Sequence, residues 1–374
     1  MSKPRFLFPF ASLLLLTLAT PLLAEKRDVY FGTGGRNADG IYHATFDTDS
    51  GKLSDANLVA EIGSPGFLAF HPDGDKLYAV ATKDKESGVA AYQVGKDGSL
   101  TLINFQPTGD GGAAHVAVHP SGKFLLTAQY GGGSVALFPL DAEGKLGPAT
   151  VTEHEGGSGV VEGRQDSPHP HYCGYSPDGK FALVPDLGMD KIVIYRIDAD
   201  APSITRHAYA ESVAGGGPRH MKFSPDGKFI YLLNELSLSV TTLAWDAEKG
   251  LASKLFVTPA LSDEAKAGEV FNSAAEILVR PDGKFLYSSN RGHDTVTVYK
   301  AEESGDLSVI QVQPIRGAFP RNINLDPTAH WLLAAGADSN TIAVHAIDQE
   351  TGRLTFQRGN VINVPSPICI LFKP

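Results

Sequence analysis

The chain has 374 residues, of which 42% are apolar and 20% are charged, with 40 Gly and 24 Pro. This composition excludes a disordered or fibrous chain and is typical of a globular, turn-rich protein. The formal net charge is −10 and no cluster of Lys and Arg occurs, so a nucleic-acid partner, which needs a basic face, is not expected.

Residues 1–24 have the organisation of a secretory signal peptide. Two basic residues precede a long apolar run that ends in small and apolar residues at Ala24. An uncleaved membrane anchor is the alternative, because the run approaches spanning length, but Pro9 and Pro21 interrupt it. We therefore expect cleavage after Ala24, export to the periplasm, and a mature protein that is not inserted in a membrane.

A hairpin motif recurs six times in the chain. In each copy a run of aromatic and aliphatic residues is followed by a turn such as Pro-Asp-Gly-Lys and then by a second run. The turn prolines are Pro72, Pro120, Pro177, Pro225, Pro281 and Pro327, which lie 48, 57, 48, 56 and 46 residues apart. This period is close to that of a four-stranded propeller blade and too long for leucine-rich or tetratricopeptide repeats.

Each repeat also predicts two further strands. Third strands are expected at 190–198, 294–302 and 340–348, and a Gly-x-Leu step opens a fourth strand at 51–62, 305–315 and 352–362. Every repeat therefore supplies the four strands of one blade.

The two ends of the chain supply a seventh copy. Residues 367–374, PICILFKP, match the first strand of the motif, and residues 28–35, DVYFGTGG, match a second strand with no first strand before it. Pairing of these strands would close the ring and remove its open edges. The sequence predicts an all-β fold, a single seven-bladed β-propeller of four-stranded blades over residues 28–374, closed by its N- and C-terminal strands.

The two cysteines, Cys173 and Cys369, fall in first strands of blades nearly opposite each other in the ring. A disulfide needs Cα atoms within about 7 Å, so we expect two free, buried thiols. Neither a Cys-x-x-Cys-His motif nor paired-cysteine metal spacing occurs, and no metal or other cofactor is expected.

Charged and polar residues gather at one mouth of the predicted central channel, where the first strand of each blade would begin and its second strand would end. Ahead of the turn these are His115, His171, Tyr172, Arg219, His220, Glu276, Arg321 and Asn322, and after it Asp186, Asn234, Glu235, Asn290 and Arg291. Each has a structural explanation, such as an Arg219–Glu235 ion pair within one hairpin. Together, so many ionisable groups at one channel mouth favour a site for an anionic ligand.

The two longest repeats carry their extra residues just before a first strand, at 155–171 and 258–276. This position puts both insertions on the charged rim. Insertions that collect on one face commonly mark the binding face of a repeat protein, although long loops also tolerate insertions for no functional reason.

Four segments carry a family resemblance: RQDSPHPHYCGYSPDGKFALVPDLGMDKIVIY (164–195), GPRHMKFSPDGKFIYLLNE (217–235), AAEILVRPDGKFLYSSNRGHDTVTVY (274–299) and FPRNINLDP (319–327). With them, nearly the whole mature chain resembles the β-propeller lactonase family, which includes propeller-type 6-phosphogluconolactonases and fungal carboxymuconate lactonizing enzymes. The resemblance implies hydrolysis of a sugar lactone without a metal. By position it implies His171, Arg219, Glu235 and Arg291 as the catalytic residues.

These residue types suit lactone hydrolysis. Glu235 or His171 is the candidate base for the water, and Arg219 and Arg291 can stabilise the oxyanion or hold a phosphate or carboxylate. We assign substrate binding to His115, His169, His220, Glu276, Asn290 and Arg321. The expected partner is a small anionic or polar sugar lactone.

Two other functions are compatible with the same rim. One is a carboxymuconate-type lactonizing cycloisomerase, and the other is a non-catalytic ligand-binding propeller, because a fold alone does not give a function. Export also bears on the substrate. The phosphogluconolactone pathway is cytoplasmic, so for an exported member the alternatives are an unphosphorylated aldonolactone such as gluconolactone and a substrate that the sequence does not identify.

Overall fold

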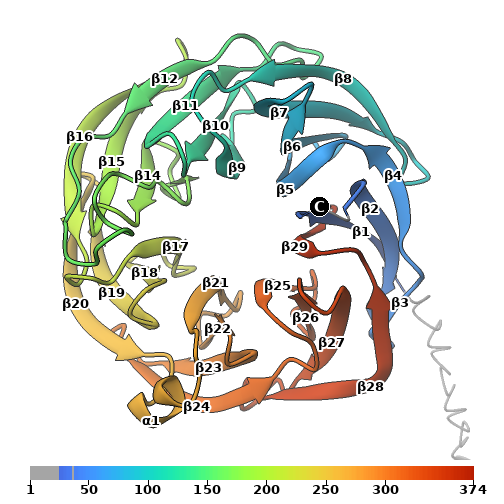
Figure 1. Ribbon diagram of the computed structural model, residues 1–374, viewed down its shortest axis with the longest axis vertical. Coiled ribbons are helices and arrows are strands. Elements are labelled where there is room, and N and C mark those ends of the chain that lie inside the picture. Colours follow the sequence, from blue (N-terminus) through green and yellow to red (C-terminus); the bar gives the residue numbers. More distant parts are fainter. Residues whose placement is uncertain (1–24, 36–37) are drawn as a thin grey trace, which may run out of the picture.

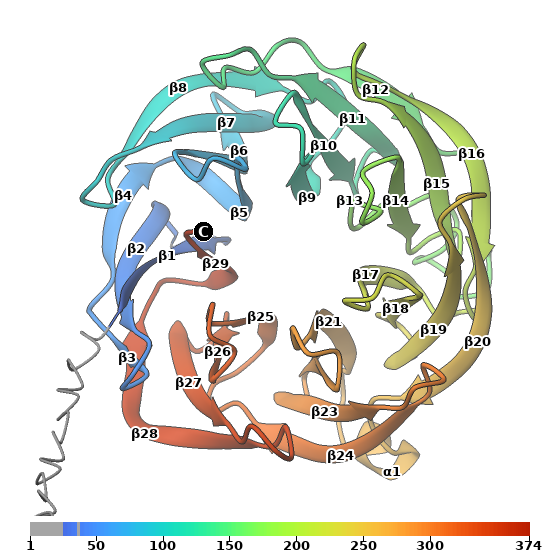
Figure 2. The same ribbon diagram turned by 180° about the vertical axis from the view of Figure 1, so that it is seen from behind.

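The structure is a computed structural model that describes residues 25–35 and 38–374. Seven antiparallel sheets stand around a central axis, as the two opposite views in Figures 1 and 2 show. The described part contains one short helix, α1 (Asp263–Ala267). The predicted all-β, seven-bladed propeller is confirmed.

The predicted signal peptide, residues 1–24, lies outside the described residues. Within the part of the chain that the structure describes, no helix is long and apolar enough to cross a membrane.

Six blades are formed by consecutive strands, numbered from the axis outward. The first is β5 (Gly63–Phe70), β6 (Lys76–Lys83), β7 (Glu86–Val94) and β8 (Leu100–Pro107), and the second is β9 (Ala113–Val118), β10 (Phe124–Gln129), β11 (Ser134–Pro139) and β12 (Thr150–Glu153). The third is β13 (Gly174–Tyr175), β14 (Phe181–Asp186), β15 (Lys191–Asp198) and β16 (Ser203–Glu211), and the fourth is β17 (Pro218–Phe223), β18 (Phe229–Asn234), β19 (Ser239–Asp246) and β20 (Leu251–Pro259). The fifth is β21 (Ser273–Val279), β22 (Phe285–Arg291), β23 (Thr295–Ala301) and β24 (Leu307–Pro314), and the sixth is β25 (Pro320–Leu325), β26 (Trp331–Gly336), β27 (Thr341–Ile347) and β28 (Leu354–Asn363).

The seventh blade joins the two ends of the chain. β29 (Pro367–Phe372) pairs with β1 (Lys26–Thr33), which pairs with β2 (Gly40–Asp47). The outermost strand is interrupted, because β3 (Lys52–Leu53) and β4 (Asn57–Glu61) both pair with β2. Closure by the terminal strands is confirmed, and the fourth strand predicted for this blade is split in two.

The Pro-Asp-Gly-Lys turns reverse the chain between the two inner strands of a blade. In the fourth blade Ser224 Oγ donates to Asp226 at 2.7 Å and accepts from the Phe229 amide at 2.9 Å, while Gly227 has a φ of 71°. A positive φ favours glycine because it has no Cβ. The sixth copy places Ala329 at this position with a φ of 55°, so it makes the same turn against a steric preference.

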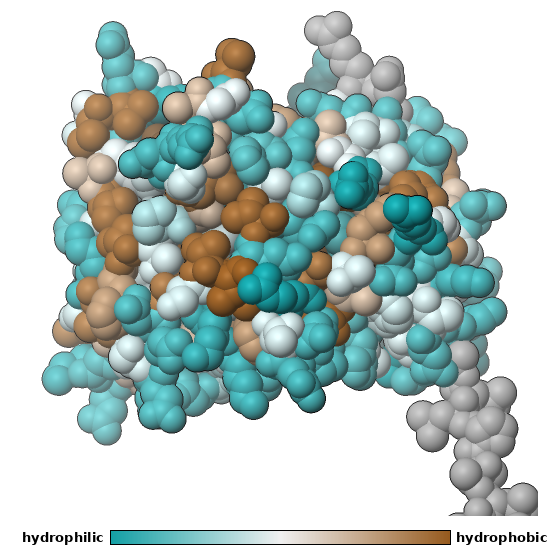
Figure 3. Space-filling model, turned by 90° about the horizontal axis from the view of Figure 1, so that it is seen from below, coloured by the Kyte–Doolittle hydropathy of each residue, from teal (hydrophilic) through white to brown (hydrophobic). Residues whose placement is uncertain are grey.

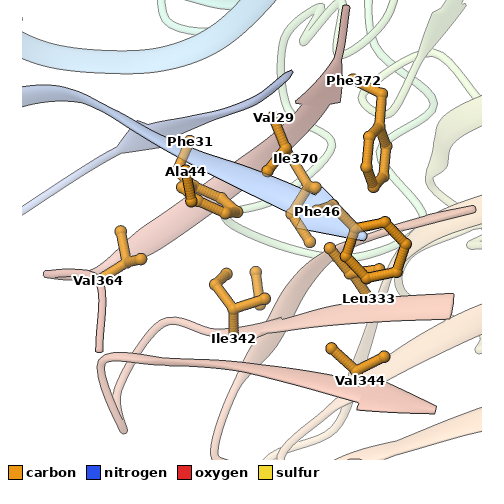
Figure 4. Packing of buried hydrophobic residues seen from close by; sticks show 11 residues of the cluster. Val29, Phe31, Ala44, Phe46, Leu333, Ile342, Val344, Val364, Ile370 and Phe372 are labelled. Atoms are coloured by element: carbon orange, nitrogen blue, oxygen red, sulfur yellow. The ribbon is translucent and has the colours of Figure 1, made fainter. Parts of the chain in front are cut away.

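Apolar side chains fill the spaces between neighbouring blades. Figure 4 shows the cluster between the sixth and seventh blades, where Phe31 and Phe46 meet Leu333 and Ile342. Phe46 also packs edge to face on Phe372, with ring centroids 5.5 Å apart. Burying such a side chain stabilises the fold by about 1.5–3 kcal/mol, so packing as well as strand pairing holds the closing blade in the ring.

The outermost strands are only partly covered. Leu251, Leu255 and Val257 of β20 are exposed, as are Val309 and Val312 of β24. Figure 3 shows an edge of the disc on which apolar residues lie among hydrophilic ones. Single exposed apolar residues of this kind are normal on a protein surface.

One inner strand differs from the prediction. The sequence predicted a full first strand ahead of Pro177, but β13 has only two residues and His171 lies in irregular chain before it. Other contacts replace the ladder there: Pro170 forms an isolated bridge with Asp186, whose carboxylate accepts from the His169 amide at 2.8 Å. The insertion before this strand therefore ends in an irregular segment fixed against β14.

Both cysteines are free and buried, as predicted. Burial raises the pKa of both thiols, that of Cys369 to about 12. Neither is therefore a reactive thiolate at neutral pH.

Candidate active site

Irregularities of the inner strands aim two arginines at the axis. The register of β17 with β18 shifts around Arg219, and the register of β25 with β26 shifts around Arg321. Such a bulge takes a side chain out of the regular alternation of a strand. As a result the consecutive residues Arg219 and His220 line the same pocket.

Two adjoining hollows lie at this rim. The main cavity has a volume of about 560 Å³, and its polar lining residues are Tyr130, Arg164, His171, Glu235, Arg291 and Arg321. The deep pocket has a volume of about 90 Å³ and is lined by Arg219 and His220 among others. The two are contiguous, because His171 and Arg321 line both.

Glu235, which directly follows β18, binds three guanidinium groups. Arg164 Nη2 donates to Oε1 at 2.8 Å, Arg219 Nε donates to Oε2 at 2.9 Å, and Arg291 Nη2 lies 3.2 Å from Oε2. The Arg219–Glu235 ion pair that the hairpin suggested is therefore one of three. One carboxylate fixes arginines from β17, from β22 and from the insertion at 155–171.

These contacts keep Glu235 ionised. Burial would raise the pKa of its carboxyl group, but Arg291 and Arg219 outweigh burial and lower the pKa to about 2. Burial lowers the pKa of Arg219 to about 9 and that of Arg291 to about 10, so both stay charged at neutral pH. Four arginines but one carboxylate line the two hollows, so the site is suited to an anion although the chain is acidic.

His171 lies between the main cavity and the deep pocket. Its side chain is buried, and its Nδ1 has no hydrogen-bond partner among the described residues. Burial, together with the charge of Arg219 and other nearby groups, lowers its pKa well below the usual value. The ring is therefore neutral and can accept a proton, while the surrounding guanidinium groups disfavour its protonated form.

A buried histidine–carboxylate pair lies next to the deep pocket. His220 Nδ1 donates to Glu276 Oε1 at 2.9 Å, and both residues are 2% exposed. Glu276 also accepts from the Ile277 amide at 3.1 Å and from Asn322 Nδ2 at 2.7 Å. Burial lowers the pKa of His220 to about 4, so this ring is neutral as well. Glu276 itself lines neither hollow.

Asn290 also lies outside both hollows. Its amide donates to Thr295 Oγ1 at 3.1 Å and to Thr297 Oγ1 at 2.9 Å within its own blade. In the preceding blade Asn234 makes the equivalent bonds to two hydroxyl groups, five and seven residues further on. The repetition gives Asn290 a structural role in the turn from β22 to β23.

Two of the histidines assigned to substrate binding pack beside the hollows. The His115 ring lies between Phe67 and Tyr172, with both centroid distances 4.2 Å. His169 stacks on Tyr130 at 4.6 Å, and its Nδ1 hydrogen bonds to the Tyr130 carbonyl at 2.8 Å. His169 therefore supports a residue of the main cavity, whereas Arg321 and His220 contribute directly to a lining.

The site predicted from the sequence did not include three lining residues with large side chains, Tyr130, Arg164 and Phe271. Tyr130 follows β10, and the other two come from the two insertions, both of which reach the main cavity. A signal existed for Arg164, which is the one Lys or Arg in the Gly-rich insertion at 155–171. Tyr130 and Phe271 carried no comparable signal, because aromatic residues are common in loops and cores alike.

Replacing Arg164 with Ala is expected to raise KM about tenfold while changing the free energy of unfolding by less than about 1 kcal/mol. The side chain is 37% exposed and its ion pair with Glu235 is partly solvated, so it contributes little to stability. Steady-state kinetics and urea unfolding measure the two effects. Arg206→Ala, which removes an exposed arginine from the outer strand β16, is the control; equal KM values in the two variants would contradict a role for Arg164.

One group of potential metal ligands occurs among the residues that the structure describes. His71, Asp73 and Asp75 lie together at the first turn, at the opposite end of the inner hairpin from the main cavity. Lys76 Nζ lies 3.3 Å from Asp73 and 2.7 Å from Asp75, so both carboxylates already bind an ammonium group.

Known proteins share this architecture. Residues 28–372 match a family model described as a lactonase with a seven-bladed β-propeller. The 6-phosphogluconolactonase of Bacillus subtilis is 35% identical over 350 residues, which are 92% of this chain and 97% of that protein. The periplasmic gluconolactonase of Pseudomonas aeruginosa is 28% identical, with a TM-score of 0.86 over 94% of this chain and 99% of that one. A crystal structure of a protein from Lactobacillus plantarum is 31% identical, with a TM-score of 0.88 over 93% and 99% of the two chains. The chain belongs to the seven-bladed β-propeller lactonase family.

Proposed function

We propose that the protein hydrolyses the ring ester of a sugar lactone. The observation that carries the proposal is a neutral His171 without a hydrogen-bond partner, beside three arginines that one carboxylate holds in place. Ester hydrolysis needs a base for the attacking water and positive charge for the carbonyl oxygen. Family membership and the relatives named as lactonases support the same activity.

In the proposed reaction His171 takes a proton from a water molecule as its oxygen attacks the lactone carbonyl. The carbonyl oxygen becomes an oxyanion, which the guanidinium groups of Arg291 and Arg321 stabilise. The bond to the ring oxygen then breaks, the ring oxygen takes up the proton, and an open-chain hydroxy acid leaves. Glu235 is a poor base because its pKa is about 2; its part is to position the arginines.

For the substrate we propose an unphosphorylated aldonolactone. The sequence of residues 1–24 predicts export, and a relative of the same architecture is a periplasmic gluconolactonase. The excess of positive charge then serves the oxyanion and the carboxylate of the product. The same charge would also bind a phosphate on the substrate, so the two kinds of lactone must be compared directly.

The test uses purified protein without residues 1–24 and two substrates that differ only in a phosphate at C6, glucono-δ-lactone and its 6-phosphate. The expected result is opening of both rings above the buffer rate, with the larger kcat/KM for the unphosphorylated lactone. A larger kcat/KM for the phosphate ester would overturn the substrate assignment. Turnover of neither lactone would overturn lactone hydrolysis.

Export is tested separately by fractionating cells that express the full chain with a C-terminal epitope tag. The tagged protein is expected in the periplasmic fraction with residues 1–24 removed. Full-length protein confined to the cytoplasm would contradict export and would restore the phosphorylated lactone as the substrate.

A further inference from the structure

Among the described residues, no carboxylate is hydrogen-bonded to His171 Nδ1 to stabilise its protonated form, and this nitrogen is enclosed without any partner there. Burial lowers the pKa of His171 most, and Arg219, His220, Arg321 and Arg291 lower it further. An imidazolium at this place would be disfavoured by the positive charges of these arginines. A base that must hold a proton during the attack of water therefore needs to pass that proton on.

The neighbouring His220 has a carboxylate partner, Glu276, whereas no carboxylate is hydrogen-bonded to His171 Nδ1 among the described residues. His220 Nδ1 donates to Glu276, so its Nε2 is the nitrogen with a free lone pair, and this Nε2 is buried without a partner among the described residues. Three donors hold the Glu276 carboxylate; although burial opposes ionisation, His220 and then Lys222 lower its pKa to about 2. An imidazolium at His220 would be paired with this carboxylate.

The deep pocket connects the two histidines. Both line it, and their ring centroids are 5.3 Å apart. A water molecule needs about 10–15 Å³ of such volume and two to four polar partners. The pocket offers about 90 Å³ and both histidines line it, and each of them has one buried ring nitrogen without a partner among the described residues.

We propose that His220, positioned by Glu276, is the proton acceptor behind His171 and is connected to it by water in the deep pocket. The inference rests on the proposed lactone hydrolysis. As the attacking water gives a proton to His171 Nε2, the proton on His171 Nδ1 moves to the pocket water, and that water gives one of its own protons to His220 Nε2. When the ring ester breaks, the same transfers run backwards and His171 protonates the ring oxygen. No proton is gained or lost, and the histidines return to their starting forms.

Glu276 is a positioning residue in this scheme, because it acts through His220. The titratable or charged groups around His220 are His115, His171, Tyr172, Arg219, Lys222, Glu276 and, across the deep pocket, Arg321. Of these, Glu276 is the carboxylate. Its charge raises the pKa of His220 against the effects of burial and of Arg219. Removing that charge is therefore expected to lower the pKa of the acceptor.

The test compares His220→Gln and Glu276→Gln with the wild-type protein on a lactone that the wild type opens. We expect His220→Gln to lower kcat about 100-fold and to leave KM within twofold, because His220 does not line the main cavity. We expect Glu276→Gln to lower kcat as well and to shift the acidic limb of the pH profile of kcat/KM to lower pH. A role in folding alone would lower Tm without moving that limb.

His154→Gln is the matched control. His154 Nδ1 lies 2.7 Å from Asp186, its Nε2 is likewise buried without a partner in the described part of the chain, and it lines neither hollow. It should lose stability and keep kcat within threefold of the wild type. Two results would overturn the relay alone, provided that the wild type opens the lactone. One is an equal kcat in His220→Gln and His154→Gln, and the other is an acidic limb that does not move in Glu276→Gln. A wild type that opens no lactone would overturn the proposed function and the relay with it.

Discussion

Replacing His171 with Gln is expected to lower kcat for lactone opening at least about 100-fold and to change the free energy of unfolding by no more than about 1 kcal/mol. General bases typically contribute 10²–10⁴-fold to a rate, which sets the size of the first effect. The second effect is small because Nδ1 of His171 makes no hydrogen bond to the residues that the structure describes and the side chain borders the main cavity. Initial rates in a pH-stat and urea unfolding measure the two quantities.

His345→Gln is the control for this variant. His345 is also a buried histidine whose pKa burial lowers to about 4, but it lies in β27, away from both hollows. It should cost stability and leave kcat unchanged. If His171→Gln keeps more than about a third of the wild-type kcat, His171 is not the base.

Replacing Glu235 with Gln is expected to lower the free energy of unfolding at neutral pH by about 3–5 kcal/mol. Removing one partner of a buried ion pair leaves the other charge uncompensated, and here three guanidinium groups lose their shared counter-charge. We also expect kcat/KM to fall, because the arginines are no longer held together. Denaturant unfolding at neutral pH gives the first value directly.

The same carboxylate predicts a pH dependence. The pKa of Glu235 is lowered in the folded protein, from 4.5 to about 2. Its contribution to stability is therefore complete above about pH 4.5 and is lost as the pH falls towards 2. The difference in unfolding free energy between the wild type and Glu235→Gln should shrink over this range. A difference that stays constant from neutral pH to pH 3 would contradict the depressed pKa.

Glu211→Gln is the control for both Glu235 experiments. Glu211 forms an ion pair with Lys191 at 3.5 Å, but its side chain is 67% exposed. Exposed pairs contribute about 0–1 kcal/mol, so this variant should unfold almost as the wild type does. A loss as large as that of Glu235→Gln would mean that burial does not determine the effect.

The fold could be predicted because its determinants are local and repeated. The turn sequence sets each inner hairpin, and the spacing of the turns sets the blade. The strand at each end of the chain lacks the partner strand of its hairpin, so pairing of the two ends is expected, and β29 pairs with β1. The one misjudged inner strand, β13, follows an insertion that replaces ladder bonds with a carboxylate contact from Asp186. Nothing in the repeat pattern indicates that contact.

From the sequence, the site could be located only to one rim of the central channel, without its detailed geometry. Aligning the repeats found Glu235, Arg219, Arg291 and Arg321, since repeated hairpins place equivalent positions at one level. The same alignment also selected Asn290, because a structural role that recurs in two neighbouring blades looks the same as a functional column. The alignment could not find Arg164, which lies in an insertion without a counterpart in the other repeats. Its contact with Glu235, 71 residues away, depends on the tertiary structure.

We propose that the cavity at this rim opens lactones with His171 as the base and arginines as the stabilising charge. The most direct measurement is acid release from glucono-δ-lactone at constant pH, with equal concentrations of the wild type and of the double variant His171→Gln/Arg291→Ala. We expect acid release well above the spontaneous rate with the wild type and release at the spontaneous rate with the double variant. Equal rates with the two proteins would contradict it.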